Sequence, residues 1–157
     1  QRFGRLDAFC HCAAELGLLT RVTDIAPDRL ERVFATNVFA TQRLLRTLDP
    51  LFRASQSPSI VAVTDSAAIG KRAFWGHYAA SKCAMEVLVR AYAAENEFRS
   101  LTVNLVDPGP MATRLRAEAY PGEAKDAQPA PETIADKILP LLAADAAQHE
   151  GTVGLRN

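Results

Sequence analysis

The chain has 157 residues, which is enough for one domain with a hydrophobic core. Hydrophobic residues make up 48% of it, and its 18 basic and 18 acidic residues give a formal net charge of zero. This balance argues against a nucleic-acid surface and an anionic membrane partner, and no apolar run approaches the roughly 18–20 residues that span a bilayer.

The N-terminal stretch QRFGRLDAF has no long apolar segment and no initiator Met, so we expect neither a signal peptide nor the native start. The three cysteines, Cys10, Cys12 and Cys83, are odd in number, and Cys-x-Cys alone is a poor zinc signature. Their places in predicted strands and helices favour small buried hydrophobic residues, which suits a reducing cytosol. We therefore expect a cytoplasmic protein without a metal site and without a membrane or nucleic-acid partner.

Short, nearly continuous apolar runs predict strands that are covered on both faces. Three such runs are clear, and a shorter fourth strand is predicted near the end of the chain: 6–14, 59–65, 101–107 and 151–155. The alternation of these strands with helical patterns predicts a mostly parallel sheet with helices on both faces. Ligands of such sheets bind at the carboxyl ends of the strands.

Three helices are predicted between these strands. In 27–48, apolar residues recur every three or four positions, and Pro27 suits the first helical position. The stretch 77–97 is rich in good helix formers and contains no Gly or Pro. A last helix is predicted at 131–145, where Pro140 should kink or split it. Before it, the polar, Pro-rich stretch 118–131 is predicted to be a mobile loop of a single domain, 1–157.

Two polar residues stand where ligands or water are expected. Asn37 falls in the apolar stripe of the 27–48 helix, and because a buried amide must be hydrogen-bonded, this helix alone favours a structural asparagine bonded to neighbouring backbone or water. Ser66 directly follows the second predicted strand. It is either a turn serine or a hydroxyl displayed at the carboxyl edge of the sheet.

Tyr78 and Lys82 lie four positions apart at the start of the 77–97 helix, on the same face. A phenol has a pKa near 10, and a nearby ammonium group favours the phenolate and lowers that pKa. Proton transfer by a tyrosine would require such a cation and a hydroxyl donor across the cleft. Lys82 and Ser66 are predicted to meet these two demands.

The third predicted strand ends in DPGPMATRLR. Pro108 and Gly109 break the chain, and Thr113 is placed to cap a short helix. These residues form either a plain loop or a rigid platform for the nicotinamide of a cofactor.

Four motifs, in this order, resemble the short-chain dehydrogenase/reductase family: TNVFAT, VTDSAA, YAASK and NLVDPGPMAT. Within that family, GKRAFWGHYAASK and TRLRAEAYPGE are most similar to the YciK-like bacterial oxidoreductases. The resemblance covers 5–157, as the second half of a family member. It implies an α/β, Rossmann-like, doubly wound parallel sheet that comprises strands 4–7 of the usual fold and lacks the N-terminal glycine-rich βαβ unit.

The resemblance also implies catalytic roles. Tyr78 would transfer a proton to or from the substrate oxygen while a hydride moves between NAD or NADP and a carbonyl or secondary alcohol. Ser66 would position that oxygen, and Lys82 would hold the nicotinamide ribose and lower the pKa of Tyr78. Asn37, through its backbone, would hold a water that links Lys82 to solvent.

Further residues are implied at the rim of the same site. Besides Tyr78 and Lys82, the cofactor would be bound by Ala13, Ala14, Pro108, Gly109, Met111 and Thr113. Trp75 is expected at the cleft entrance and His77 at the cleft edge, where both would touch substrate. His11 is expected to be structural.

Two departures from the family pattern leave the function open. The glycine-rich turn that cradles the cofactor pyrophosphate is absent, and His11-Cys12-Ala13-Ala14 replaces Asn-Asn-Ala-Gly. The chain is then either a fragment of a longer oxidoreductase, with weak or no cofactor binding by itself, or a non-catalytic module or inactive remnant kept for association. In both cases we expect a homodimer or homotetramer that packs through 27–48 and 77–97.

Overall fold

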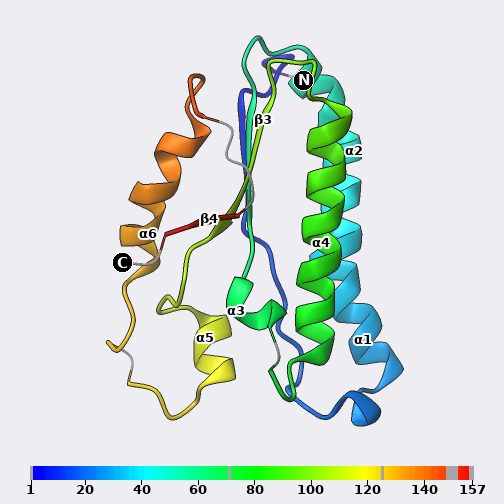
Figure 1. Cartoon of the computed structure of the whole chain (residues 1–157), viewed down its shortest axis with the longest axis vertical. Helices are drawn as coiled ribbons and strands as arrows, with labels where there is room; N and C mark the ends of the chain where they lie inside the picture. Colours follow the sequence, from blue (N-terminus) through cyan, green and yellow to red (C-terminus); the bar gives the residue numbers. More distant parts are fainter. Residues whose placement is uncertain (1, 71, 125, 148–151, 156–157) are drawn as a thin grey trace.

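Four parallel strands form one sheet in the order β1-β2-β3-β4 in the computed structural model, which describes residues 2–70, 72–124, 126–147 and 152–155 (Figure 1). Each strand is shorter than predicted, but all four predicted strands are confirmed: β1 (Ala8–His11), β2 (Ser59–Val63), β3 (Thr102–Asp107) and β4 (Thr152–Gly154). Because every neighbouring pair is parallel, the carboxyl ends of the strands lie at one edge of the sheet. That edge is where a ligand site is expected.

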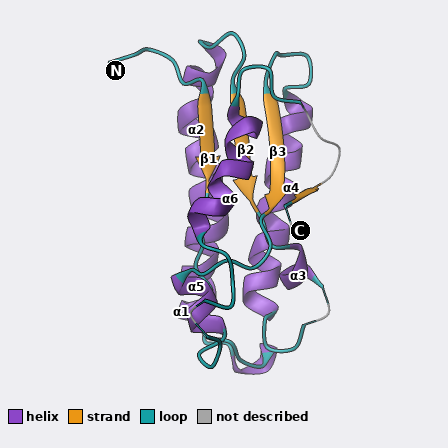
Figure 2. Ribbon diagram, turned by 90° about the vertical axis from the view of Figure 1, so that its left-hand side faces the viewer, coloured by secondary structure: helices purple, strands orange, loops and turns teal. Residues whose placement is uncertain are grey.

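Helices cover both faces of the sheet, as the alternating pattern predicted. Figure 1 shows α2 (Ala40–Arg53) and α4 (Gly76–Glu95) side by side on one face and α6 (Pro131–Ile138) on the other. In Figure 2, α6 lies across the sheet in front of the strands. The Rossmann-like arrangement of an α/β protein is therefore confirmed.

The predicted 27–48 helix is one continuous helical segment that changes its winding in the middle. It begins at Pro27 in α1 (Pro27–Phe34), passes through a π-helical turn, η2 (Ala35–Phe39), and continues as α2 to Arg53. π-helical turns inside α-helices occur frequently at functional sites. Asn37 lies at the centre of this turn and is buried.

The main core lies between the sheet and the layer made by α2 and α4. Phe52 of α2 and Met85 and Val89 of α4 pack there against Ile60 and Leu105 of the strands. The remaining short elements lie in the connections: η1 (Val22–Asp24), α3 (Ser66–Ile69) and α5 (Arg114–Ala119). This packing fixes the first turns of α4 over the carboxyl edge of β2 and β3.

The C-terminal part follows the sequence prediction with one refinement. Pro140 splits the predicted 131–145 helix: α6 ends at Ile138, and a 3₁₀ turn, η3 (Leu139–Leu142), follows. Residues 118 and 119 of the predicted loop belong to α5, and a bidentate ion pair from Arg116 to Glu123 ties the loop back to this helix. The mobility of 118–131 remains a prediction.

Candidate active site

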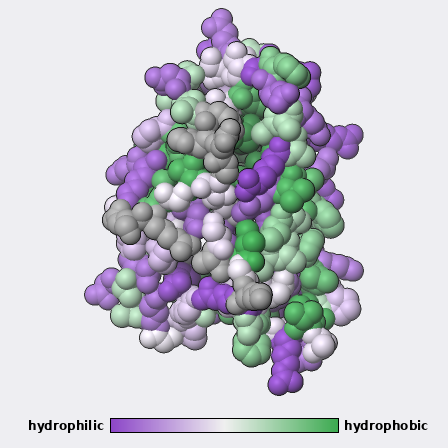
Figure 3. All heavy atoms as spheres, in the orientation of Figure 1, coloured by the Kyte–Doolittle hydropathy of each residue, from purple (hydrophilic) through white to green (hydrophobic). Residues whose placement is uncertain are grey.

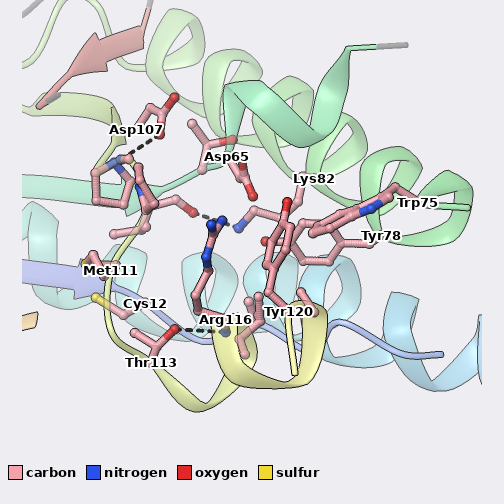
Figure 4. Close-up of a pocket in the computed structure, with 18 of the residues that line it drawn as sticks. Cys12, Asp65, Trp75, Tyr78, Lys82, Asp107, Met111, Thr113, Arg116 and Tyr120 are labelled. Atoms are coloured by element: carbon pink, nitrogen blue, oxygen red, sulfur yellow. Dashed lines mark hydrogen bonds between the residues drawn. The ribbon is translucent and has the colours of Figure 1, made fainter. Parts of the chain in front are cut away.

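A cavity of about 440 Å³ opens at the carboxyl ends of the first three strands (Figure 4). Its wall is built by segments far apart in the sequence: the loop after β1, the ends of β2 and β3, the start of α4, and α5. The volume lies within the range of small-molecule sites, which is about 300–1,000 Å³. The cavity is therefore the candidate active site.

Tyr78 and Lys82 face this cavity together, as their spacing predicted. Both are buried, with 3% of each residue exposed, and both come from the first two turns of α4. The Lys82 Nζ donates a hydrogen bond of 2.7 Å to the backbone oxygen of Val63 at the end of β2. An ammonium group has three donors, so two N–H groups of Lys82 are left for other partners at the cavity.

The pKa of Tyr78 is not lowered as the motif predicted. The pKa of Tyr78 is raised above its usual value, chiefly because the hydroxyl is buried and also because the Asp65 and Asp107 carboxylates disfavour the phenolate. Burial lowers the pKa of Lys82 to about 8, while the charge of Asp65 opposes this shift. Tyr78 is consequently protonated at neutral pH and is a weaker proton donor than a free phenol.

Ser66 does not line the cavity. The chain turns into α3 at Ser66, whose side chain is exposed, whereas Asp65, one residue earlier, lines the cavity wall. Figure 4 shows Asp65 directed towards Lys82 and Tyr78. The predicted hydroxyl across from Tyr78 is thus replaced by a carboxylate, and the only signal of it in the sequence is the position of Asp65 directly after the apolar run of β2.

Asn37 has the structural role that its helix favoured. Its side chain accepts a hydrogen bond from the Glu15 backbone N–H at 2.7 Å and donates to the Glu15 oxygen at 2.9 Å and to the Ser81 Oγ at 2.8 Å. The Ser81 hydroxyl in turn donates to the backbone oxygen of Tyr78 at 2.7 Å. Asn37 does not line the cavity, but it ties the loop after β1 to the turn of α4 that carries Tyr78.

The strand-end loop has the geometry of a platform beside the cavity. Asp107 accepts a hydrogen bond of 2.9 Å from the Gly109 N–H, and Gly109 adopts a φ of +73°, which favours glycine. Thr113 caps α5 by accepting from the Arg116 N–H at 3.1 Å. Most of the residues implied to bind a cofactor line this side of the cavity: Ala14, Pro108, Gly109, Met111 and Thr113. Ala13 is exposed and does not.

Among the residues expected at the cleft rim, Trp75 lines the cavity but His77 does not. His77 is 2% exposed and packs behind the cavity, where a Cβ on Gly17 would lie 2.6 Å from its Nε2 atom. His77 is therefore not among the residues that line the cavity, and its predicted contact with substrate stays a prediction. His11 is also buried and forms a 2.8 Å hydrogen bond with Thr41 Oγ1, as expected of a structural residue.

The cysteine prediction fails at one position. Cys12 is exposed and lines the cavity, with its sulfur 3.3 Å from that of Cys10. The Cys10 thiol and the charge of Lys82 lower the pKa of Cys12 to about 7, against the effect of burial. Cys12 is thus a polar wall residue rather than a buried hydrophobic one.

The sequence did not indicate that α5 would complete the cavity. Figure 4 shows Arg116 and Tyr120 reaching from this segment towards Tyr78 and Lys82. The Arg116 guanidinium lies 3.7 Å from the centre of the Tyr120 ring, and the Tyr120 ring lies 6.1 Å from that of Trp75. These side chains meet only because the loop after β3 folds back over the start of α4.

In the part of the chain that the structure describes, no group of three or more His, Cys, Asp or Glu side chains is arranged to hold a metal ion. No helix of that part combines the length and the apolar character needed to cross a membrane.

The residues at the strand-end side of the cavity fit the nicotinamide end of a dinucleotide. Gly109 brings a backbone without a side chain to the wall, and Lys82 offers the two N–H groups that a pair of ribose hydroxyls would accept. Ala14, in the loop after β1, also lines the cavity.

Known proteins resemble this chain over most of its length. A family model described as Enoyl-(Acyl carrier protein) reductase matches residues 1–141. The oxidoreductase YciK of Escherichia coli (strain K12) is 35% identical over 149 residues, which make up 95% of this chain and 59% of YciK. The solved structure of YciK from E. coli aligns with a TM-score of 0.92 and 33% identity over 99% of this chain and 64% of that one.

A second solved structure, a short-chain dehydrogenase from Escherichia coli CFT073 complexed with NADPH, aligns with a TM-score of 0.91 at 33% identity. The alignment covers 99% of this chain and 65% of the chain in that structure. The chain therefore spans 59% to 65% of the length of these relatives.

Proposed function

The chain belongs to the short-chain dehydrogenase/reductase family, and from this premise we propose that it is the catalytic half of an NAD(P)-dependent oxidoreductase with Tyr78 as general acid. The reaction would exchange a hydride between the nicotinamide and a carbonyl or secondary alcohol. The observation that carries this proposal is the burial of Tyr78 and Lys82 side by side at the cavity, above the carboxyl ends of β2 and β3.

Each cavity residue has a separate task in this proposal. A bound NAD(P)H supplies the hydride. Lys82, fixed by its bond to the Val63 oxygen, holds the ribose hydroxyls, and the loop from Asp107 to Met111 orients the nicotinamide end. Tyr78 donates its proton to the substrate oxygen, because its raised pKa keeps it protonated at neutral pH.

We assign to Asp65 the place expected of Ser66 opposite Tyr78. An ionised carboxylate accepts hydrogen bonds but donates none, so it orients a substrate hydroxyl better than a developing oxyanion. Its charge also makes Tyr78 a weaker acid. Asp65 is thus expected to slow reduction compared with a serine at the same place.

A Tyr78→Phe substitution in the whole protein tests the proposal. General acid catalysis contributes about 10²–10⁴-fold, so the variant should lose at least about 100-fold in kcat while its affinity for NADPH, measured by fluorescence titration, stays within about twofold. Tyr92→Phe removes the same hydroxyl from the same helix outside the cavity and is the matched control. Full activity of the Tyr78 variant would show that Tyr78 is not the acid.

A second candidate function is a non-catalytic module kept for association. It is favoured by the carboxylate of Asp65 opposite Tyr78 and by the methyl group of Ala14 in the cavity wall. Calorimetric titration of the whole protein with NADH and NADPH separates the two candidates, because only the oxidoreductase has to bind the cofactor. For this chain by itself we expect weak or no binding, because the glycine-rich turn that holds the pyrophosphate is not part of the sequence.

Association is proposed to use the outer surfaces of α2 and α4. Val87 on α4 and Phe39, the last residue of η2 before α2 begins, are 66% and 51% exposed. Figure 3 shows hydrophobic surface along the side formed by α4, between hydrophilic side chains. A homodimer or homotetramer would cover this surface.

A further inference from the structure

The cavity has two chemically different ends. Figure 4 shows Asp107, Met111 and Cys12 on one side and Trp75, with the Tyr78 and Tyr120 rings, on the other. Trp75 and Tyr78 form an edge-to-face pair with ring centres 5.8 Å apart, and Tyr120 closes the wall beside them. The first end suits a cofactor, and the aromatic end is left for the body of a substrate.

Arg72 places a positive charge at this aromatic end. It lines the cavity, with its guanidinium carbon 4.1 Å from the centre of the Trp75 ring and 5.4 Å from that of Tyr120. A guanidinium that stacks on an aromatic ring keeps its N–H groups at its edge, where they are available for hydrogen bonds.

The backbone before Trp75 is held in an unusual conformation that fixes this stack. Phe74 has a φ of +72°, in the left-handed region that a bulky residue seldom adopts, and its carbonyl oxygen accepts a hydrogen bond of 3.1 Å from the Thr20 N–H. The turn closes where the Trp75 N–H donates to the Arg72 oxygen at 3.5 Å. Strained conformations of this kind are concentrated at ligand sites.

The other two cationic side chains at the cavity, Arg116 and Lys82, are hydrogen-bonded to groups of the protein. Arg116 is engaged by the Glu123 carboxylate through two hydrogen bonds of 2.7 and 2.6 Å, and Lys82 donates to the Val63 oxygen. Arg72 forms no ion pair with a carboxylate of the described residues. At the opposite end, Asp107 is turned to the Gly109 N–H.

We propose that Arg72 binds the carboxylate of the substrate, so that the site takes a small oxo acid with an apolar or aromatic body. This inference rests on the proposed oxidoreductase function for the identity of the reacting carbonyl group. The planar fork of a guanidinium matches a carboxylate with two parallel hydrogen bonds, and the aromatic wall beside it offers apolar surface to the body of the molecule. The Arg72 guanidinium carbon lies 4.1 Å from the centre of the Trp75 ring, and that centre lies 5.8 Å from the centre of the Tyr78 ring. One small molecule can therefore reach both Arg72 and Tyr78.

The test is a titration of the 157-residue chain with benzoylformate, an aromatic oxo acid, and with its uncharged methyl ester. Trp75 is the single tryptophan of the sequence, so its one indole N–H signal in a ¹H–¹⁵N spectrum reports on the Arg72 stack without any turnover. We expect benzoylformate to shift this signal in a saturable manner, and the ester to bind at least about tenfold more weakly.

Two variants and one control complete the test. Arg72→Gln should weaken benzoylformate binding by about tenfold or more, and Arg72→Lys, which keeps the charge but not the planar fork, by less. Arg43→Gln, at an exposed arginine of α2 outside the cavity, should bind as the unaltered chain does. The proposal is overturned if the ester binds as tightly as the acid, or if both Arg72 variants bind benzoylformate unchanged.

Failure of the proposed function would look different. If benzoylformate binds through Arg72 but the whole protein never oxidises NADPH or NADH with it or with other oxo acids, the carboxylate site stands and the oxidoreductase proposal falls. If NADPH is oxidised with neutral ketones alone, the oxidoreductase proposal stands and the carboxylate site falls.

Discussion

Replacement of Asn37 by alanine is expected to destabilise the fold by about 2–4 kcal/mol. The side chain makes hydrogen bonds of 2.7, 2.9 and 2.8 Å to two backbone groups of Glu15 and to Ser81. Each net hydrogen bond contributes about 0.5–1.5 kcal/mol, and a buried group left without a partner costs about 1–3 kcal/mol. Since Ser81 keeps its bond to the Tyr78 oxygen, most of the loss comes from the two Glu15 groups.

Urea unfolding followed by circular dichroism measures this loss, with hydrogen exchange of the Glu15 amide as a local readout. Asn37→Asp retains the acceptor for the Glu15 N–H and should cost less than alanine. Gln42→Ala, at an exposed position of the same helix, should change the free energy of unfolding by less than about 0.5 kcal/mol. If Asn37→Ala lies within about 0.5 kcal/mol of the unaltered chain and the Glu15 amide stays protected, the inferred tie between β1 and α4 is refuted.

Charge, burial and exposed apolar surface give three further predictions. Asp65→Asn in the whole protein should lower the pKa of Tyr78, because it removes a negative charge that disfavours the phenolate. The alkaline limb of the pH profile of kcat/KM for reduction should then move to lower pH, and the rate at about pH 7 should rise by roughly severalfold. An alkaline limb that does not move would rule out this coupling. Burial lowers the pKa of His77, so the unfolded chain binds more protons than the folded chain below about pH 6.5. The contribution of His77 to the free energy of unfolding should be complete above that pH and fall as the pH decreases. His77→Leu should flatten this pH dependence when the free energy of unfolding is measured by urea titration. Val87→Lys should shift the chain towards monomer in light scattering because it places a charge on the exposed apolar surface proposed for association, and a monomer before mutation would contradict the proposed interface.

Much of the fold was predictable because its signals are local. Continuous apolar runs identified all four strands. The two central strands, β2 and β3, are buried nearly throughout and so need apolar side chains on both faces, whereas β1 and β4 are partly exposed. The recurrence of apolar residues identified the long helix from Pro27, and the Tyr78–Lys82 spacing indicated a shared helix face. The split at Pro140 followed from the missing N–H of proline.

The composition of the cavity wall was not local and could not be read in the same way. Whether Asp65 or Ser66 faces Tyr78 depends on where the chain turns from β2 into α3, and one residue decides it. His77 and Cys12 exchanged their expected environments, because burial is set by what packs over a residue, here Gly17 over His77.

The sequence alone therefore determined the four strands and their parallel arrangement, the helix that carries Tyr78 and Lys82, and the glycine turn at the end of β3. Only the tertiary structure decided the electrostatics of the site. Asp65 and Asp107 come from two separate segments and act on Tyr78 through space, and Arg72 of a third segment stacks on Trp75. Burial of the hydroxyl raises the pKa of Tyr78, and the two carboxylates raise it further, because charges at short range in a buried cavity interact strongly whatever their separation along the chain. The pKa is therefore raised where the motif predicted a lower one.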